Sequence, residues 1–370
     1  MNYSIVIVGA GPAGIGAGIL LKKLNFNDFI IIEKSEVGSS FQKWPKEMKL
    51  ITPSFTGQGF GALDLNAIAP DTSPAYTLNK EHLSGRDYAE YLKMLATHFD
   101  LPIAPGVEVI HVKKGDSKYK LLTPQGVYIA DSIIWATGEY QFPNLTPFSG
   151  SEHAIHSSNI PSWKALQGKD RIIIGGYESG IDAAVNLIHT HNKVTVLSRS
   201  SVWDSESPDP SRGLSPYTKE RLVHAMDSNR LIIKEKVEVR EIKKEKDTYK
   251  IILDNKFIYK TKQRPILATG FHSGAILLKE LFAWGEQGKP ILTSKDESTE
   301  TPNLFLIGPS VVHEKVIFCF IYKFRQRIAV VIKEILDRLE YQYDKSIFKQ
   351  YQDNNMLLSD LSCCEVSCEC

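Results

Sequence analysis

The first thirty-three residues constrain the fold more than any other part of the chain. A β-branched run, YSIVIVG, leads into GAGPAG and then into an apolar segment. The short apolar run predicts a buried parallel strand, and the segment after the turn predicts a helix. In such a unit Gly9 permits the tight turn, Gly11 lets a pyrophosphate approach the backbone, and Gly14 lets helix and strand pack closely. This pattern predicts an α/β fold with a dinucleotide at the positive end of the helix.

A second apolar strand, DFIIIEK, ends in Glu33, nineteen residues after Gly14. An acid at this distance is where the ribose hydroxyls of a dinucleotide need an acceptor. The alternative, a glycine turn in a nucleotide-free α/β protein, is disfavoured by this context. The cofactor-binding residues expected here are Gly9, Gly11, Pro12, Ala13, Gly14, Glu33 and Lys34.

The middle of the chain repeats the pattern with two departures. DRIIIGGYESGIDAAVNLI again runs from a strand through a glycine turn into a helix, and KVTVLSRSS supplies the next strand. Tyr177 stands where the central glycine is expected, so its side chain would narrow the phosphate path. The next strand ends in Arg199, and a guanidinium binds the 2′-phosphate of NADPH that an acid would repel. A solvated surface arginine is the alternative. The residues expected to bind NADPH are Gly175, Gly176, Glu178, Ser179, Arg199 and Ser200.

Two strands that close on Ala-Thr-Gly, IIWATGEY (133–140) and PILATGFH (265–272), and a late TPNLFLIG strand (301–308) complete the set of motifs. With these motifs in this order, residues 1 to about 335 resemble the two-dinucleotide-binding-domain flavoproteins, the superfamily of thioredoxin-reductase-like enzymes and flavin-containing monooxygenases. The resemblance implies two Rossmann-like domains and the cofactors FAD and NADPH. It places these residues beside the cofactors: Ala136, Thr137, Gly138, Ala268, Thr269, Gly270 and Gly308.

The same resemblance predicts the domain organisation. Residues 1–157 and 273–340 form the FAD-binding domain, 158–272 form an inserted NAD(P)H-binding domain, and 341–370 form a C-terminal extension. KVIFCFIYKFRQRIAVVIKEILDRL predicts a long helix beside the flavin, and a short helix should follow it before the tail. The family's usual aspartate after the last glycine, which contacts the ribityl chain, is replaced by Pro309 and Ser310.

The resemblance implies an FAD-dependent NADPH oxidoreductase, in which hydride passes from NADPH to FAD and then electrons to oxygen or to a thiol or disulfide. No cysteine lies between Met1 and Phe318, so the internal Cys-x-x-Cys of thioredoxin reductases is missing, and Ala13 replaces a cysteine often found in bacillithiol disulfide reductases.

Phe41 and Trp44, in GSSFQKWPKEMKLITPSF, resemble the aromatic loop of the monooxygenases and are expected to contact the cofactor. FSGSEHAIHSS approximates the FxGxxxH motif of these enzymes, but His156 falls two residues late. For His153 and His156 a linker position without a catalytic role is the alternative. Monooxygenase-like and thiol-reductase-like chemistry both stay open.

The chain ends in LSCCEVSCEC, which holds Cys363, Cys364, Cys368 and Cys370. These thiols could relay electrons from the flavin, capture a soft metal, or have no redox role. Cys319, within the predicted long helix, is expected to be a buried small hydrophobe, with a relay partner as the alternative. A redox-sensing or metal-handling flavoprotein that uses the terminal cysteines is the alternative function. No resident metal site is predicted.

Composition sets the remaining bounds. The 370 residues carry a formal net charge of +1, so no net field favours nucleic acid or an anionic membrane. No apolar run reaches the roughly 20 residues of a membrane span. One cysteine outside the tail indicates a reducing, cytoplasmic setting. The expected partners are a small-molecule or thiol substrate, and a homodimer is an open alternative.

Overall fold

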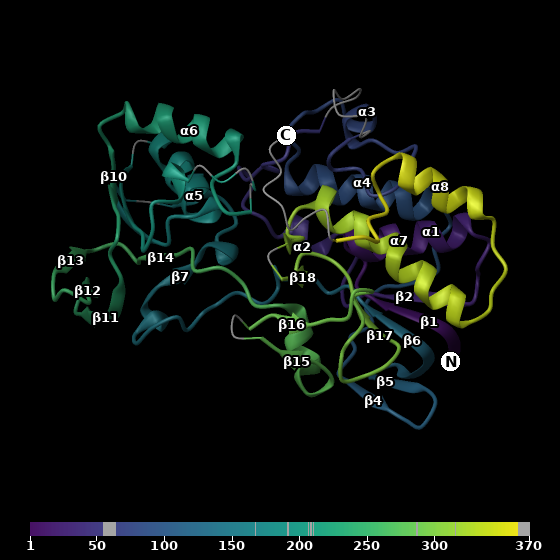
Figure 1. The fold of residues 1–370 in the computed structure, drawn as a ribbon. Helices are drawn as coiled ribbons and strands as arrows, with labels where there is room; N and C mark the ends of the chain where they lie inside the picture. The colour runs from purple at the N-terminus through teal and green to yellow at the C-terminus, as the bar shows by residue number, and fades with distance from the viewer. Residues whose placement is uncertain are drawn as a thin grey trace. The chain divides into compact units, whose positions relative to one another are not determined.

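The structure, a computed structural model, describes residues 1–54, 64–166, 168–190, 192–205, 207, 209, 211–285, 288–314 and 316–361. The chain separates into two compact units (Figure 1). The first unit comprises the described parts of Met1–Gln42, Pro53–Gln141 and Ser273–Cys370, and the second comprises those of Lys43–Thr52 and Phe142–His272.

A seven-stranded sheet forms the centre of the first unit. Its order is β3-β2-β1-β6-β5-β4, and β17 also pairs with β6. The strands are β1 (Asn2–Val8), β2 (Phe29–Ile32), β3 (Ile103–Ala104), β4 (His111–Lys114), β5 (Tyr119–Thr123), β6 (Gly126–Trp135) and β17 (Leu304–Leu306). β6 pairs antiparallel with β5 through its first half and parallel with β17 through Ile133–Trp135. At the carboxyl end of β1 the neighbouring parallel strands are therefore β2 on one side and β6, then β17, on the other.

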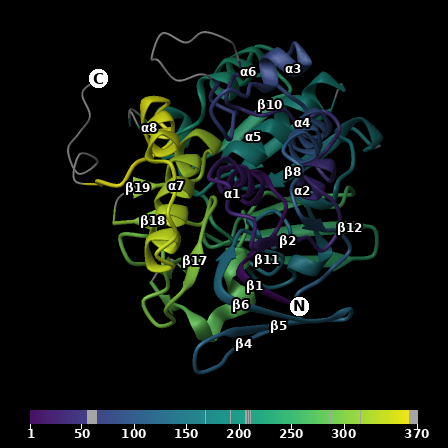
Figure 2. The same ribbon diagram turned by 90° about the vertical axis from the view of Figure 1, so that its right-hand side faces the viewer.

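Helices of the first unit cover this sheet (Figure 2). They are α1 (Pro12–Lys23), α2 (Ser39–Gln42), α3 (Pro74–Leu78), α4 (Gly85–His98), α7 (Ile321–Arg338), α8 (Lys345–Asp353) and the 3-10 segment η5 (Gly274–Leu281). α7 packs against α1 through a face that includes Ile328, whose side chain lies close to Gly16. Two short hairpins complete the unit: β15 (Ala283–Trp284) with β16 (Pro290–Ile291), and β18 (Val312–His313) with β19 (Val316–Ile317).

The predicted start of the long helix is wrong. α7 begins at Ile321, because Val316–Ile317 form β19, which pairs with β18 (Val312–His313), and the Phe318 N–H donates to the Val311 carbonyl (3.1 Å). Cys319 therefore precedes the helix and is exposed, so the expectation of a buried helical cysteine is also wrong. The short helix expected before the tail is confirmed as α8.

The second unit has a parallel sheet of its own, in the order β10-β9-β8-β14-β7. Its strands are β7 (Ile155–His156), β8 (Asp170–Ile174), β9 (Lys193–Leu197), β10 (Leu231–Lys234) and β14 (Ile266–Leu267). Successive residues point to opposite faces. Ile173, Val196 and Ile266 pack with α5 (Glu178–His189) and α6 (Pro216–Met226). Ile174 and Leu267 pack with the antiparallel sheet of β11 (Val239–Glu245), β12 (Thr248–Leu253) and β13 (Ile258–Thr261).

Two segments lie in the second unit although the sequence placed them in the first domain. Within Lys43–Thr52, the Glu47 carboxylate accepts hydrogen bonds from the Ser162 hydroxyl (2.7 Å) and the Trp163 N–H (2.9 Å). Residues 142–157 join the unit because β7 pairs with β14. These contacts are long-range, so local sequence patterns do not report them.

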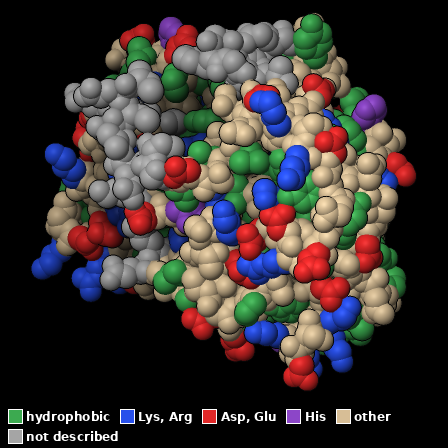
Figure 3. All heavy atoms as spheres, turned by 45° about the vertical axis from the view of Figure 1, so that its right-hand side comes forward, with side chains coloured by type: hydrophobic (Ala, Val, Ile, Leu, Met, Phe, Trp, Pro, Cys, Tyr) green, Lys and Arg blue, Asp and Glu red, His purple; other side chains and the backbone are tan. Residues whose placement is uncertain are grey.

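Basic and acidic side chains are interspersed on the face drawn in Figure 3, as the small net charge suggests. Within the described ranges, no helix combines the length and apolar character needed to cross a membrane.

Candidate dinucleotide-binding sites

The first glycine turn links β1 to α1 and has little spare room on its inner side. Gly9 has a φ of 110°, and a Cβ there would lie 2.5 Å from the Ala136 carbonyl oxygen. A Cβ on Gly14 would lie 1.9 Å from the Gly9 carbonyl oxygen. Gly11 precedes α1 as its N-cap, and a Cβ there would meet no atom of the described residues within 4 Å. Gly9 and Gly14 are thus needed for packing, whereas Gly11 borders open space at the helix N-terminus.

Glu33 lies buried directly after β2 and faces this turn. One carboxylate oxygen accepts the Ala10 N–H (2.8 Å), and the other accepts the Ser35 N–H (2.8 Å). A carboxylate offers about four lone-pair positions, so it can still accept ribose hydroxyls. Lys34, by contrast, is exposed and pairs with Glu108 (2.6 Å).

The first Ala-Thr-Gly segment and Gly308 meet at the same turn. The Ala136 N–H donates to the Val8 carbonyl (2.8 Å), and a Cβ on Gly308 would lie 3.7 Å from the Cβ of Ala13. The Thr137 hydroxyl is buried and has no hydrogen-bond partner among the described residues. Gly138 has a φ of 66°. The ends of β1, β6 and β17 therefore converge on one region that holds an unsatisfied polar atom.

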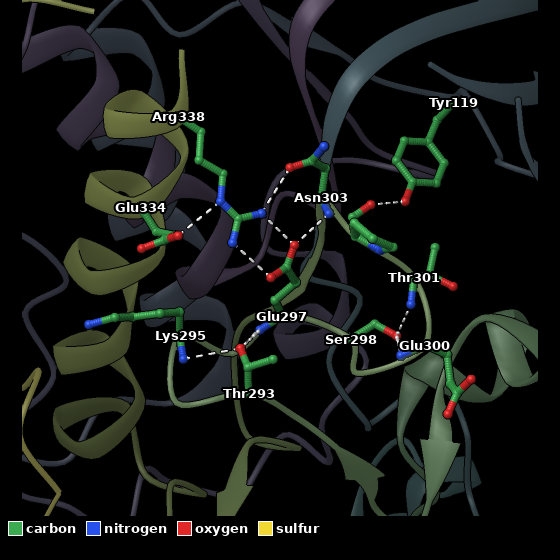
Figure 4. A network of polar contacts seen from close by, with 11 residues as sticks. Tyr119, Thr293, Lys295, Glu297, Ser298, Glu300, Thr301, Asn303, Glu334 and Arg338 are labelled. Atoms are coloured by element: carbon green, nitrogen blue, oxygen red, sulfur yellow. Dashed lines mark hydrogen bonds and ion pairs between the residues drawn. The ribbon is translucent and has the colours of Figure 1, made fainter. Parts of the chain in front are cut away.

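A polar network fixes the start of β17 (Figure 4). The Glu297 carboxylate accepts two hydrogen bonds from the Arg338 guanidinium, at 2.5 and 2.8 Å, and one from the Asn303 N–H (2.6 Å). Arg338, at the end of α7, also pairs with Glu334 (2.9 Å). The Tyr119 hydroxyl of β5 donates to the Pro302 carbonyl. These bonds hold the chain that leads to Gly308 against β5 and α7.

The second glycine turn is built like the first. Gly175 has a φ of 112°, and a Cβ there would lie 2.2 Å from the Ala268 carbonyl oxygen. A Cβ on Gly180 would lie 1.9 Å from the Gly175 carbonyl oxygen, and one on Gly176 would lie 2.4 Å from the Ser198 hydroxyl. The pairing of turn and Ala-Thr-Gly strand therefore occurs once in each unit.

Side chains that follow this turn have their own places within the second unit. Tyr177 is the N-cap of α5, in the place that Gly11 has at α1, and is 39% exposed. The Glu178 carboxylate points to the N-terminus of α6, where it accepts from the Ser215 N–H and the Thr218 hydroxyl (2.6 Å). Burial raises the pKa of Glu178. Its side chain is thus committed to α6, and what Glu178 and Ser179 can offer a phosphate is their backbone N–H groups at the helix N-terminus.

Arg199 follows β9 and is accessible. Its side chain is 80% exposed and forms a long ion pair, 3.9 Å, with the Glu238 carboxylate. Ser200 is also exposed, while the buried Ser198 hydroxyl donates to the Ser200 carbonyl (2.6 Å). A basic and a hydroxyl side chain therefore stand at the strand end where a 2′-phosphate would be recognised.

The second Ala-Thr-Gly segment is tied to the chain that enters the second unit. The Thr269 hydroxyl donates to the Asn144 carbonyl (2.9 Å), and the Gly270 carbonyl accepts the Asn144 N–H (3.0 Å). His156 is buried, with Nε2 3.2 Å from the Gly270 carbonyl and Nδ1 2.8 Å from the Ser158 hydroxyl. Desolvation lowers the pKa of His156. This histidine is thus a hydrogen-bonded part of the second unit.

A sequence model of the pyridine nucleotide-disulphide oxidoreductases matches residues 6–308. The chain belongs to this family. This membership confirms the resemblance to pyridine nucleotide oxidoreductases that the sequence motifs indicated. A curated relative, the uncharacterized oxidoreductase CzcO-like of Geobacillus kaustophilus, is 29% identical over 50% of this chain and 51% of its own. The uncharacterized oxidoreductase CzcO of Bacillus velezensis is 30% identical over 54% of this chain and 55% of its own. The chain thus spans about half the length of the curated relatives it matches.

Solved structures confirm the predicted α/β fold. The bacillithiol disulfide reductase Bdr from Staphylococcus aureus superposes with a TM-score of 0.76 at 22% identity, covering 91% of this chain and 99% of its own. The flavin-containing monooxygenase from Stenotrophomonas maltophilia does so with a TM-score of 0.72 at 16% identity, over 91% and 99%.

The two aromatic residues predicted to contact the cofactor belong to different units of the chain. Phe41 lies in α2 of the first unit, with its ring 4.8 Å from that of Tyr88. Trp44 belongs to the segment that packs in the second unit.

One polar group at the first site was missed by the sequence reasoning. Glu139 follows the first Ala-Thr-Gly directly and contacts Lys289 (2.6 Å) and Ser310 (2.8 Å). Its position next to the motif was the available signal, but its partners lie 150 and 171 residues further along the chain.

The terminal cysteines Cys363, Cys364, Cys368 and Cys370 lie outside the described residues. The described chain is held shortly before them. Arg327, fully buried and paired with Asp296 (2.9 Å), donates to the Leu358 carbonyl (2.5 Å). Within the described ranges, no group of three His, Cys, Asp or Glu side chains is placed to hold a metal ion.

Proposed function

We propose that the chain is an NADPH-dependent FAD oxidoreductase. FAD binds at the first glycine turn, NADPH binds at the second, and the electrons pass to oxygen or to a thiol or disulfide acceptor. The family and its two kinds of structural neighbour support this class of reaction.

The first site fits FAD on the evidence of its own atoms. Open space borders Gly11 at the α1 N-terminus, where backbone N–H groups suit a pyrophosphate. The buried Thr137 hydroxyl lacks a partner among the described residues, and a bound polar ligand would supply one. This unsatisfied hydroxyl beside an open glycine turn is the observation that carries the proposal. The flavin, when bound, exchanges electron pairs between the nicotinamide and the acceptor.

The second site fits NADPH by charge. Arg199 and Ser200 are exposed after β9, at the strand end where an NADH site would carry an acid. The side chain of Tyr177 stands at the edge of the turn, and we propose that it turns aside or stacks on the ligand when the phosphates approach Glu178 and Ser179.

Anaerobic titration of the purified protein with NADPH and NADH in parallel tests this function. We expect the protein to bind FAD, and NADPH to bleach the flavin absorbance at lower concentrations than NADH. A protein that takes up no added FAD, or whose flavin neither nucleotide reduces, would contradict the proposal.

A thiol acceptor is the second candidate, and one set of contacts favours it. The Arg327 guanidinium lies 5.7 Å from the ring centre of Phe318 and also binds the Leu358 carbonyl. The anchored end of the described chain thus lies near the exposed Cys319. Cys363 follows Leu358 by five positions in the sequence, a reach of about 17 Å. A relative, the Bacilliredoxin reductase Bdr of Bacillus subtilis, is 24% identical.

Truncation after Leu361 tests whether the terminal thiols accept electrons from the flavin. If the terminal thiols relay electrons, the truncated protein should lose NADPH-driven reduction of a disulfide dye while its flavin is still reduced. Electron uptake should also fall from more than two to two per FAD. Equal dye reduction by both proteins would remove the tail from the mechanism.

A further inference from the structure

The residues around Glu139 form a built polar group at the carboxyl end of the first unit's sheet. Glu139 follows β6, Ser310 follows β17, and Lys289 extends from the β15–β16 hairpin. One Glu139 oxygen accepts both the Lys289 ammonium (2.6 Å) and the Ser310 hydroxyl (2.8 Å). Ser310 is 2% exposed, and the side chain of Glu139 is 22% exposed. The Glu139 carboxylate is therefore held by Lys289 and Ser310 and remains partly exposed, so a ligand can contact it.

The order of the strands assigns a place to this group. β1 has β2 on one side and β6 with β17 on the other, so β1 is a point where the strand order reverses and where ligands bind in open α/β sheets. Glu33 stands beyond β2, and Glu139 stands beyond β6. The two carboxylates thus flank the glycine turn on opposite sides.

The negative charge of the Glu139 carboxylate limits which part of a bound dinucleotide it can contact. A carboxylate accepts hydrogen bonds and repels phosphate, so its ligand group must be a donor. FAD has two sets of hydroxyl donors, the ribose beside the adenine and the polyol beside the flavin ring, separated by the pyrophosphate. With the pyrophosphate at Gly11 and the ribose at Glu33, the polyol leaves on the side where β6 and β17 end.

We propose that Glu139, positioned by Lys289 and Ser310, accepts hydrogen bonds from the polyol hydroxyls of FAD. This inference rests on the proposed function of the first site. The Lys289 ammonium keeps the carboxylate in place and offsets its charge near the pyrophosphate. The unsatisfied Thr137 hydroxyl, two residues before Glu139, is a further polar atom on this side of the turn.

The test compares two ligands that share one half. FAD and ADP both carry the adenosine and the pyrophosphate, but ADP lacks the polyol. Dissociation constants of the FAD-depleted protein are measured by flavin fluorescence for FAD and by calorimetry for ADP. The variants are Glu139→Ala and Glu139→Gln, with Glu90→Gln, an exposed residue of α4, as the matched control.

We expect both Glu139 variants to weaken FAD binding about tenfold or more and to leave ADP binding unchanged, because a hydrogen bond to a charged group is lost. Glu33→Ala should instead weaken both ligands. Unchanged FAD affinity in folded Glu139→Gln protein, or equal losses for FAD and ADP, would reduce Glu139 to a structural ion pair and overturn the inference. If Glu139→Ala does not fold, the isosteric Glu139→Gln decides. Wild-type protein that binds no FAD would instead refute the proposed function itself.

Discussion

Thr137 and Thr269 occupy matching positions in the two Ala-Thr-Gly segments but differ in their hydrogen bonds. The Thr269 hydroxyl donates to the Asn144 carbonyl at 2.9 Å, whereas the Thr137 hydroxyl is buried with no partner in the part of the chain that the structure describes. The second segment is thus satisfied by the protein itself. The first is left to be completed by a ligand or by water.

This difference predicts opposite effects of the same substitution. Thr137→Val removes an unsatisfied polar atom, so the FAD-free protein should be as stable as wild type or more stable. Thr269→Val leaves the Asn144 carbonyl without its donor and should lower the free energy of unfolding by about 1–2 kcal/mol. Urea denaturation of the FAD-depleted proteins measures both. A larger loss for Thr137→Val than for Thr269→Val would contradict the assignment.

Substitutions at two glycines of the first turn should have different effects, one on folding and the other on FAD binding. Gly14→Ala places a Cβ against the Gly9 carbonyl and should prevent normal folding or lower the melting temperature strongly. Gly11→Ala meets open space at a φ of −82°, which alanine adopts readily, so the FAD-depleted protein should melt as wild type does. FAD binding by Gly11→Ala should be weaker, because the methyl group occupies the approach path. Wild-type FAD affinity in Gly11→Ala would place the pyrophosphate elsewhere.

Arg199 should determine the choice of nicotinamide cofactor. Arg199→Ala removes the exposed cation after β9 and should raise the dissociation constant for NADPH by about tenfold while leaving that for NADH unchanged. Lys260→Ala, a basic residue of β13, is the matched control. Fluorescence titration of the reduced nucleotides gives both constants. Parallel changes for NADPH and NADH would show that Arg199 does not read the 2′-phosphate.

The Glu297–Arg338 pair should contribute stability that depends on pH. Burial raises the pKa of Glu297, but the hydrogen bonds from Arg338 and Asn303 outweigh it and hold the pKa below its ordinary value of 4.5. The folded state therefore binds the proton less readily than the unfolded state, and the contribution is present above pH 4.5 and is lost as pH falls through the lower pKa of the folded protein.

Glu297→Gln should accordingly lower the free energy of unfolding by about 1–2 kcal/mol at pH 7, a modest value because Arg338 is partly exposed. The difference from wild type should shrink as the pH is lowered below 4.5. Glu300→Gln, an exposed neighbour, should show little change at either pH. If the difference in free energy of unfolding stays constant down to pH 3, the charge of the Glu297 carboxylate does not contribute to the stability.

The elements that sequence reasoning found are those whose signals are local. Both glycine turns, their strands and their helices follow from short runs of residues, and Gly9 and Gly175 have the positive φ that such turns require. The strand β19 was taken as helix because the apolar spacing in KVIFCFIYKF also suits a helical face.

Contacts of site residues with partners far away in the sequence could not be predicted from the sequence. Nothing near Glu178 in the sequence indicates that its carboxylate caps α6 through Thr218, forty residues later. The contacts of Glu139 with Lys289 and Ser310 join segments that only the folded sheet brings together. The same holds for Glu47, which binds Ser162 across the chain.

Arg327 grips the C-terminal segment by a main-chain oxygen, which every amino acid possesses. This hydrogen bond does not depend on which side chain stands at position 358. Mutations can therefore reshape the residues that follow, including the number and spacing of terminal cysteines, without loosening the point from which they extend. The residues that follow position 358 can therefore be exchanged, in evolution or by design, while the rest of the fold stays the same.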